Sequence, residues 1–214
     1  MSGTCCHSKS AGKLFSFFAH RSRIRLEKKG FEASQKQLLA GLEQVGYRGA
    51  TLLEIGCGVG HLHQSLLEKG AETAAGIDLA PMMLSEARSW AEERGLGDRV
   101  SYIEGDFMEL DEDLATADVC LLDKVVCCYP DAYGLVQKSL ARTRRAYALT
   151  YPRDRWFIHL ATSVWNFLLW LIRSDFRTFV HDPAKIERWI TGAGFAKNFE
   201  GHTAGWLTQV YVRP

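Results

Sequence analysis

The sequence predicts an α/β protein with a mostly parallel, doubly wound sheet and helices on both of its faces. Short apolar runs alternate with segments of helical spacing from residue 51 onward, which is typical of βαβ units. The run Val119-Cys120-Leu121-Leu122 is apolar throughout, as expected for a strand covered on both faces. Two further runs near the end of the chain, 195–201 and 206–212, indicate a closing antiparallel pair.

The individual elements follow from apolar spacing and from glycine and proline at their ends. Strands are predicted over residues 51–56, 73–79, 99–107, 117–123, 145–152, 195–201 and 206–212. Helices are predicted over residues 31–45, 61–70, 81–95, 131–142, 154–172 and 183–194. Pro81 suits the first turn of one helix, and Gly70 suits the end of another.

Length and composition indicate one globular domain. The chain has 214 residues, of which 47% are hydrophobic and 24% charged, so it can bury a full core. Its 26 basic and 25 acidic residues give a net charge of +1, which disfavours a nucleic-acid partner. Six cysteines without a disulfide-type spacing or a signal-peptide pattern predict a reducing, cytoplasmic compartment.

We expect three parts along the chain. Residues 1–12 are small and polar and are predicted to be flexible. Residues 13–46 are predicted to form a helical lid or edge, and 47–214 the main domain, with an apolar helical insertion at about 154–180. The basic, amphipathic stretch 13–29 is expected to pack on the domain edge with a solvated basic face. Its alternatives are a flap over an anionic ligand and a membrane-surface contact.

The stretch 156–172 holds 17 residues without a formal charge. It is at the short end for a membrane-spanning helix and contains polar residues such as His159 and Asn166. We expect a buried or half-buried helix there. A membrane-surface helix and a true span are the alternatives, and a lid over the site or a dimer interface would suit the same residues.

Four consecutive predicted strands end in glycines or acids. The first runs into Glu54-Ile55-Gly56-Cys57-Gly58-Val59-Gly60, the second ends at Asp78-Leu79, the third at Asp106-Phe107 and the fourth at Asp123-Lys124. Ligands of open α/β sheets bind at the carboxyl ends of the strands, where glycines let a ligand touch the backbone. Asp78 can accept hydrogen bonds from both hydroxyls of a ribose, Asp106 can bond an adenine amino group, and Phe107 can lie against the base.

Two common nucleotide motifs are not matched. No Gly-Lys-Ser/Thr follows the glycines, so the loop is not a P-loop. Counted from Gly56, the third glycine of a dinucleotide fingerprint is replaced by His61, so binding of NAD is less favoured. A nucleotide-binding oxidoreductase stays as an alternative.

The motifs E-I-G-C-G-V-G, G-I-D-L and E-G-D-F, in this order over roughly residues 50–150, resemble the class I S-adenosylmethionine-dependent methyltransferases. The resemblance implies a seven-stranded Rossmann-like sheet with an antiparallel closing strand. It also implies S-adenosylmethionine as cofactor and S-adenosylhomocysteine as product. The cofactor-binding residues that it implies are Glu54, Gly56, Cys57, Gly58, Gly60, Asp78, Leu79, Asp106, Phe107, Asp123 and Lys124.

A narrower resemblance rests on residues 123–131 and 151–156. These segments are similar to small bacterial methyltransferases near the magnesium-protoporphyrin O-methyltransferases, although residues 13–45 do not align with the lid of that enzyme. The apolar run 156–172 and the basic stretch 13–29 could together form a lid over a flat, apolar, anionic molecule. We therefore expect a small or medium-sized acceptor that is apolar, aromatic or carboxylate-bearing. The chain lacks the Asn/Asp-Pro-Pro-Tyr/Phe tetrad, which disfavours amino groups of nucleic-acid bases as acceptors.

Three residues are candidates for acceptor chemistry. Tyr129 could orient the acceptor or act as a weak base, although packing beneath the cofactor is the simpler interpretation of Cys127-Cys128-Tyr129. His181 is a candidate base, and Arg153 could hold an acceptor carboxylate or form a salt bridge at a helix start. No metal site is predicted, and the chain is expected to be a monomer or homodimer. A cofactor-binding protein without turnover is a further alternative.

Overall fold

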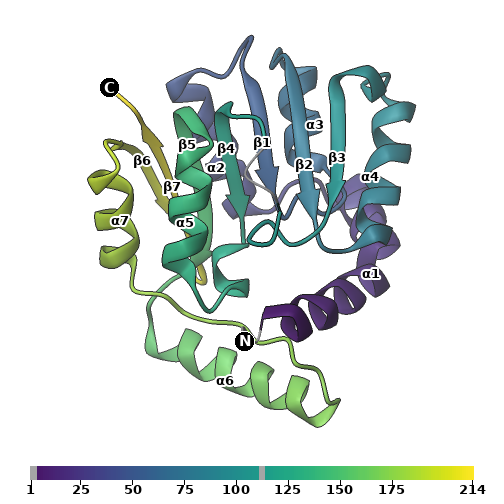
Figure 1. Cartoon of the computed structure of the whole chain (residues 1–214), viewed down its shortest axis with the longest axis vertical. Coiled ribbons are helices and arrows are strands. Elements are labelled where there is room, and N and C mark those ends of the chain that lie inside the picture. Colours follow the sequence, from purple (N-terminus) through teal and green to yellow (C-terminus); the bar gives the residue numbers. More distant parts are fainter. Residues whose placement is uncertain (1–3, 111–113) are drawn as a thin grey trace.

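The computed structural model describes residues 4–110 and 114–214, except for the side chains of 4–9, 17 and 18. It contains one seven-stranded sheet in the order β3-β2-β1-β4-β5-β7-β6 (Figure 1). The strands are β1 (Thr51–Ile55), β2 (Thr73–Asp78), β3 (Val100–Glu104), β4 (Ala117–Asp123), β5 (Thr143–Pro152), β6 (Ala196–His202) and β7 (Trp206–Val212). Strands β1 to β5 pair in parallel, and β7 runs antiparallel to both β5 and β6. The predicted fold class is confirmed.

Seven α-helices accompany the sheet in the described residues. They are α1 (Thr4–Lys29), α2 (Ala33–Val45), α3 (His61–Glu68), α4 (Pro81–Glu93), α5 (Ala132–Ala141), α6 (Trp156–Leu171) and α7 (Pro183–Gly192). Short 3-10 turns cover Gly97–Arg99 and Val126–Cys128. Asp131 and Asp182 cap α5 and α7, where each carboxylate accepts a hydrogen bond from a backbone N–H in the first turn.

The central strand β4 shows how the two faces of the sheet are covered. Successive side chains of a strand point to opposite faces. Val119 and Leu121 therefore pack with α2 and α3, whereas Cys120 and Leu122 pack with α5 and α7. All four side chains are fully buried, which explains why this run has no polar residue.

The strand order creates the place for a ligand site. The chain passes from β1 outward through β2 to β3 and then returns to add β4 on the other side of β1. The connections that leave β1 and β4 thus diverge, and open α/β sheets bind ligands in the crevice at such a switch point. The crevice lies at the carboxyl ends of the strands, the lower edge of the sheet in Figure 1.

Two helices and one loop lie across that edge, and we call α1, α6 and residues 172–182 the cap. Helix α1 packs along α4, where Ala19 and Leu26 contact a cluster that includes Trp90. Near its N-terminal end, Ala11 and Phe15 of α1 contact Leu169 of α6 and Phe176 of the loop. The rings of Phe15 and Phe176 meet edge to face, 5.5 Å apart.

Helix α1 extends further than predicted. It begins at Thr4, so the expected flexible segment 1–12 is helical from that residue on. Residues 1–3 and the side chains of Phe17 and Phe18, which belong to the amphipathic pattern, lie outside the described residues. The helix packs beside α4 through Ala19 and Leu26.

The expectation of a buried or half-buried helix over 154–172 is wrong. Leu169 is the buried side chain of α6, whereas Trp156 is 77% exposed and most of its other large apolar side chains are also exposed. The reason is the position of α6 in the cap, where one narrow side of the helix meets α1 and the 172–182 loop. Within 4–110 and 114–214, no helix is long and apolar enough to cross a membrane.

Candidate active site

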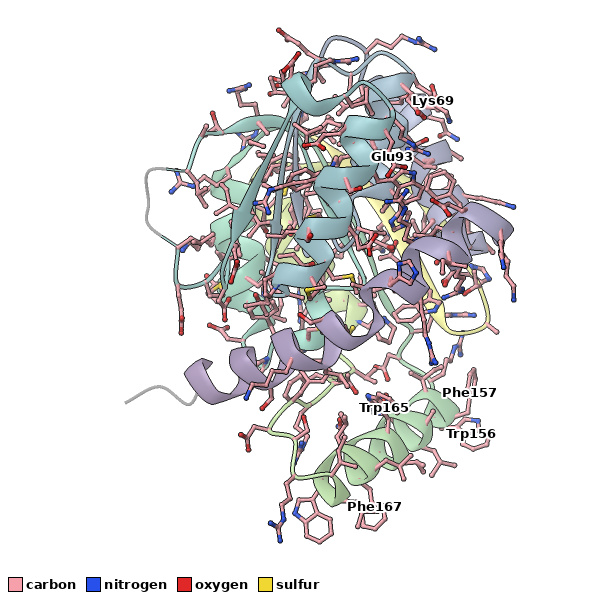
Figure 2. The ribbon with its side chains drawn as sticks, turned by 90° about the vertical axis from the view of Figure 1, so that its right-hand side faces the viewer. Lys69, Glu93, Trp156, Phe157, Trp165 and Phe167 are labelled. Atoms are coloured by element: carbon pink, nitrogen blue, oxygen red, sulfur yellow. The ribbon has the colours of Figure 1, made fainter. Side chains whose placement is uncertain are left out.

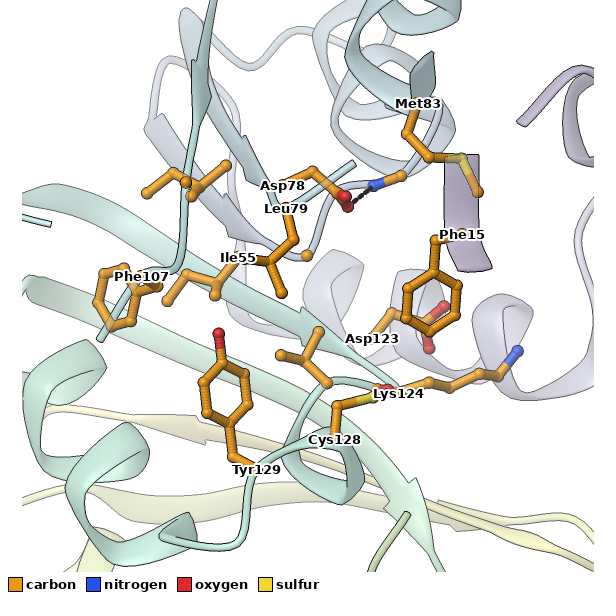
Figure 3. A pocket seen from close by; sticks show the side chains of 15 residues that line it. Phe15, Ile55, Asp78, Leu79, Met83, Phe107, Asp123, Lys124, Cys128 and Tyr129 are labelled. Carbon is orange, nitrogen blue, oxygen red and sulfur yellow. Dashed lines mark hydrogen bonds between the residues drawn. The ribbon is translucent and has the colours of Figure 1, made fainter. Parts of the chain in front are cut away.

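A pocket of about 210 Å³ opens where β1, β2 and β4 end (Figure 3). Its walls are mostly apolar, and Asp78, Asp123 and Lys124 supply the charged groups. Phe15 of α1 forms part of the wall on the cap side. Because pockets for drug-sized ligands start at roughly 300 Å³, a nucleotide-sized ligand would extend beyond this space or displace Phe15.

The glycine loop after β1 has the backbone shape that a close ligand requires. Gly56 and Gly58 both line the pocket and have positive φ angles of 66° and 54°. A Cβ on Gly56 would lie 2.5 Å from Cγ2 of Val125. A Cβ on Gly58 would meet no atom within 4 Å, so it would project into open space. The loop therefore presents bare backbone to the pocket at Gly58.

Asp78 is fixed by the backbone on both of its oxygens. Oδ2 accepts from the N–H of Gly58 and Oδ1 from the N–H of Ala80, each at 2.8 Å. Burial raises the pKa of this carboxyl, and the backbone N–H groups oppose that shift. Each oxygen keeps a lone pair for a further donor, which suits a pair of ligand hydroxyls.

Asp123 is held by the N-terminal helices. Its Oδ2 accepts from Nε2 of Gln35, 2.8 Å away, and the same amide nitrogen lies 2.8 Å from Nε2 of His61. Oδ1 of Asp123 is buried without a hydrogen-bond partner among the described residues. Burial raises the pKa of Asp123 above its ordinary value, and the neighbouring Lys124 ammonium only partly offsets that rise. A buried carboxylate oxygen without a partner on the pocket wall is a ready acceptor for a ligand N–H or O–H group.

Lys124 follows Asp123 in a left-handed backbone conformation, with φ of 62°. Its ammonium pairs with Glu32, which also pairs with Arg25 of α1. Burial alone would raise the pKa of Glu32, but Lys124 and Arg25 lower it. This network ties the start of α2 to the end of β4 and so closes one side of the site.

Three of the predicted cofactor residues lie behind the glycine loop and do not line the pocket. Glu54 is fully buried, with Oε2 at 2.6 Å from Nδ1 of His63. Cys57 is buried at the loop, and a Cβ on Gly60 would lie within 3 Å of Gln64, His63 and Tyr102. Strand alternation explains Glu54: it points toward α3, whereas the next residue, Ile55, lines the pocket.

Asp106 also lies behind the wall. Its Oδ1 accepts from the hydroxyl of Tyr129 at 2.8 Å and from the N–H of Met108 at 3.0 Å. Phe107 and Tyr129 line the pocket itself, where Figure 3 shows the Tyr129 hydroxyl pointing into the space between Phe107 and Ile55. Burial, together with the Asp106 charge, raises the pKa of Tyr129 well above its ordinary range, which keeps the phenol neutral.

The other two candidates for acceptor chemistry hold the backbone near the site. Nε2 of His181 lies 3.0 Å from the carbonyl oxygen of Tyr129, and burial lowers the pKa of this histidine. Nη1 of Arg153 donates to the carbonyl oxygen of Thr203 at 3.0 Å. Neither side chain lines the pocket. In the described part of the chain, no three His, Cys, Asp or Glu side chains gather as metal ligands would.

The structure thus brings seven of the eleven predicted cofactor residues and one of the three predicted catalytic residues to the pocket. These are Gly56, Gly58, Asp78, Leu79, Phe107, Asp123, Lys124 and Tyr129. Sequence reasoning missed the apolar wall residues Phe15, Ile55, Ile77, Met83 and Val125, the backbone at Gly105, and Gln35 behind Asp123. Cys128, which was expected to pack beneath the cofactor, lines the pocket. The strand-end positions of Ile55 and Ile77 could have indicated them, whereas Phe15 reaches the pocket only through the packing of α1.

The comparisons with known proteins agree with this geometry. A family model described as "Methyltransferase domain" matches residues 52–146, which run from β1 into β5. The chain is 31% identical over 107 residues to the ribosomal protein L11 methyltransferase of Alteromonas mediterranea, covering 47% of this chain and 37% of that protein. It is 28% identical over 178 residues to the ubiquinone biosynthesis O-methyltransferase of Neisseria meningitidis serogroup C, covering 77% and 72%. The chain thus spans less than two thirds of the length of the first relative and more than two thirds of the length of the second.

The chain therefore contains a match to the methyltransferase-domain family over residues 52–146 and has the fold of the class I S-adenosylmethionine-dependent methyltransferases. Within that class it is similar to the magnesium protoporphyrin IX methyltransferase of Synechocystis, whose structure contains S-adenosylhomocysteine. That likeness has a TM-score of 0.67 at 19% identity and covers 94% of this chain and 99% of the other. The cyclase SpnF has the same fold, with a TM-score of 0.71 at 14% identity, so the fold by itself does not specify the reaction.

The pocket residues fit the cofactor of this class. Asp78 offers two fixed oxygens for ribose hydroxyls, and Gly58 exposes backbone without a side chain. Oδ1 of Asp123 has no partner among the described residues and could accept a hydrogen bond from an ammonium group. Ile77, Leu79 and Phe107 provide apolar surface for the adenine ring. When bound, S-adenosylmethionine supplies an activated methyl group on a positively charged sulfur.

Proposed function

We propose that this chain binds S-adenosylmethionine and transfers its methyl group to a small or medium-sized acceptor that is apolar, aromatic or carboxylate-bearing. The observation that carries the proposal is the pocket itself. Bare glycine backbone, the fixed carboxylate of Asp78 and the buried carboxylate of Asp123 meet there within mostly apolar walls. Such a combination suits a ligand that has hydroxyl and ammonium groups at one end and an apolar acceptor beside it.

The work of this chain in the reaction is to align two molecules and to exclude water. Asp78 and the Gly58 backbone hold one ligand, while Phe15, Val125 and Cys128 supply apolar surface near it. Alignment of this kind lowers the barrier of a bimolecular displacement because orientation has been fixed by binding. Asp123 completes the cofactor site, because its buried Oδ1 would accept a hydrogen bond from the ammonium group of that ligand.

Tyr129 fits an orienting role better than that of a base. Its hydroxyl donates to Asp106, and its neutral phenol resists loss of a proton at ordinary pH. An acceptor oxygen or ring could still contact it across the pocket. Arg153 and His181 would act by holding Thr203 and Tyr129 in place.

The acceptor class is supported by the walls and by the relatives. The match to the ubiquinone biosynthesis O-methyltransferase extends over most of both chains, whereas the match to the L11 methyltransferase covers less than half of either. The apolar wall residues Phe15, Val125 and Cys128 supply the surface that a small apolar acceptor would contact.

Calorimetric titration with S-adenosylhomocysteine tests the cofactor, with NADH as the control ligand. We expect micromolar binding of the first and none of the second. Gly58→Ala should weaken that binding at least tenfold because its Cβ enters the pocket. Gly95→Ala is the matched control, since Gly95 has a similar φ of 68° and open space around it but lies at the end of α4.

Binding of NADH in place of S-adenosylhomocysteine would overturn the proposal in favour of an oxidoreductase. The acceptor is then sought with S-adenosylmethionine and a panel of aromatic alcohols and aromatic carboxylic acids, with methylated products followed by mass spectrometry. Cofactor binding without transfer to any member of a broad panel would favour a binding protein without turnover.

A further inference from the structure

Helix α6 presents an apolar stripe to the outside of the molecule. Its members are the exposed large side chains within about a third of the helix circumference, at 100° per residue. They are Trp156, Phe157, Leu160, Val164, Phe167, Leu168 and Leu171. No polar side chain interrupts this arc. An amphipathic helix of a globular protein turns a stripe of this width toward the core, and α6 turns it outward.

The opposite side of α6 is firmly attached, so the direction of the stripe is fixed. Leu169 packs against Ala11 and Phe176 in the cap. The side chain of Asn166 donates to the carbonyl oxygen of Thr178 and accepts from its backbone N–H, both at 2.9 Å. Figure 2 shows α6 below the body of the molecule, with Phe167 pointing away from it.

Basic residues flank the stripe at both ends. Four arginines and two aspartates lie between residues 153 and 177, a net charge of 4 − 2 = +2 around an uncharged helix. Arg155 directly precedes α6 and Arg173 follows it, and both are exposed. An apolar face bounded by arginines complements an anionic lipid bilayer. The apolar side chains suit its acyl chains, and the arginines suit its negatively charged headgroups.

From this arrangement we propose that α6 docks on an anionic phospholipid bilayer, lying along its surface with the apolar stripe among the upper acyl chains. The 16 residues of α6 span about 24 Å, which is short of the roughly 30 Å hydrocarbon core, so the helix lies in the interface and does not cross it. Tryptophan at both ends of the helix, Trp156 and Trp170, suits the headgroup boundary.

A bilayer fits the stripe better than a second copy of this chain. Protein interfaces carry about one hydrogen bond per 100–200 Å² and a polar rim, and the arc of α6 offers no polar side chain to supply them. The stripe also follows a single convex helix, which a rigid partner would touch along a narrow strip, whereas fluid acyl chains can surround it.

Docking would place the pocket beside the lipid. The cap and the pocket lie at the same edge of the sheet (Figure 1). If the methyl transfer proposed above is correct, this arrangement favours an acceptor that is dissolved in the bilayer. The docking itself does not depend on that reaction.

Cosedimentation of the full chain with lipid vesicles tests the proposal. We expect binding to phosphatidylcholine vesicles that contain phosphatidylglycerol, and weaker binding to pure phosphatidylcholine. Leu160→Asp combined with Val164→Asp should weaken binding at least about tenfold, because two apolar side chains no longer enter the acyl region. Arg155→Ser and Arg173→Ser should each weaken binding to the anionic vesicles about fivefold.

The control is Tyr133→Asp on α5, whose side chain is 54% exposed, similar to Leu160 at 58% and Val164 at 52%. It should bind vesicles like the unaltered chain. Titration with S-adenosylhomocysteine checks that every variant keeps its site. Quenching of tryptophan fluorescence by brominated lipid in the unaltered chain tests insertion without any substitution.

Three outcomes would overturn the proposal. The first is an unaltered chain that binds neither kind of vesicle and shows no lipid quenching. The second is equal vesicle binding by the Leu160/Val164 double variant. The third is a dimer in sedimentation equilibrium that this double variant converts to a monomer without vesicle binding, which would make the stripe a contact between copies. Loss of S-adenosylhomocysteine binding with vesicle binding intact would instead count against the proposed function alone.

Discussion

Strand β4 and helix α6 both carry apolar runs without a formal charge, residues 119–122 in β4 and all of α6, and the two runs lie in opposite environments. Val119, Cys120, Leu121 and Leu122 of β4 are each fully buried between two layers of helices. In α6, Leu169 is buried, and the stripe from Trp156 to Leu171 faces outward. The apolar side chains of β4 are therefore covered by the core, whereas the stripe of α6 stays exposed among the described residues.

The difference shows that an apolar run predicts an apolar environment for that segment. It does not predict whether neighbouring elements of the same chain or an outside surface form that environment. In β4 the alternation of side chains meets α2 and α3 on one face and α5 and α7 on the other. Among the described residues, α6 meets α1 and the 172–182 loop through Leu169 and Asn166, and Ile158 lies near Gly205, so that one narrow side is covered. A helix with more apolar circumference than its neighbours cover offers a surface on which a partner outside the chain can dock.

The sharpest test of this comparison is the same substitution in both regions. Leu121→Ala in β4 should lower the free energy of unfolding by about 2–5 kcal/mol, because it leaves a cavity in the core. Leu160→Ala in α6 should change it by less than about 0.5 kcal/mol, because the side chain is exposed. Urea denaturation of both variants measures the two values. Equal losses would mean that α6 is packed in solution and would break the comparison.

Strands β2 and β3 end in two acids with different surroundings: Asp78 is half-buried and lines the pocket, whereas Glu104 is exposed. Asp78→Ala should weaken binding of S-adenosylhomocysteine about a hundredfold, since two charge-assisted hydrogen bonds to hydroxyls are lost. Glu104→Ala is the control: Glu104 pairs with Asp78 in the sheet register but is exposed and does not line the pocket. Calorimetry gives both affinities. Unchanged affinity in Asp78→Ala would show that the ribose role is assigned to the wrong residue.

Burial at the site should also appear in the pH dependence of stability. Burial, with nearby His63 and Lys124, lowers the pKa of His61 to about 3. The unfolded chain binds a proton at this histidine near pH 6.5, whereas the folded chain does not. The free energy of unfolding should therefore fall as the pH drops below about 6.5, by at most about 2 kcal/mol at pH 5.

His61→Gln isolates this contribution. The variant should lose less stability than the unaltered chain between pH 6.5 and pH 5, as measured by urea denaturation at both values. Identical pH profiles would mean that His61 is solvated in the folded chain and that Gln35 and Phe31 do not shield it from water.

The smallest expected effect concerns Tyr129. Tyr129→Phe removes one hydrogen bond to Asp106, which is worth about 1 kcal/mol of stability. Because the phenol is held neutral, we expect methyl transfer to keep its pH profile and to fall by no more than about fivefold. A loss of several orders of magnitude with the fold intact would instead identify Tyr129 as the proton acceptor.

Much of the sheet and part of the site could be predicted from the sequence, for a local reason. Asp78 and Asp123 end apolar runs, and the ends of parallel strands meet at one edge whatever the helices do. Glu54 also lies near the end of a strand, but its side chain points to the face of the sheet opposite to that of Ile55. It therefore pairs with His63 of α3 and does not reach the pocket. Gln35 and Phe15 could not be found in this way, because both reach the site from helices that precede the sheet in the chain.

The sequence by itself determined the fold class, the strand-end motifs and the resemblance to the methyltransferases, because alternation, glycine turns and residue order are local properties that do not depend on how the cap is arranged. Only the tertiary structure decided that α1 closes the pocket with Phe15, that Tyr129 is bound to Asp106, and that α6 turns its apolar stripe outward. Those features depend on contacts between segments far apart in the chain, whose geometry no local pattern encodes.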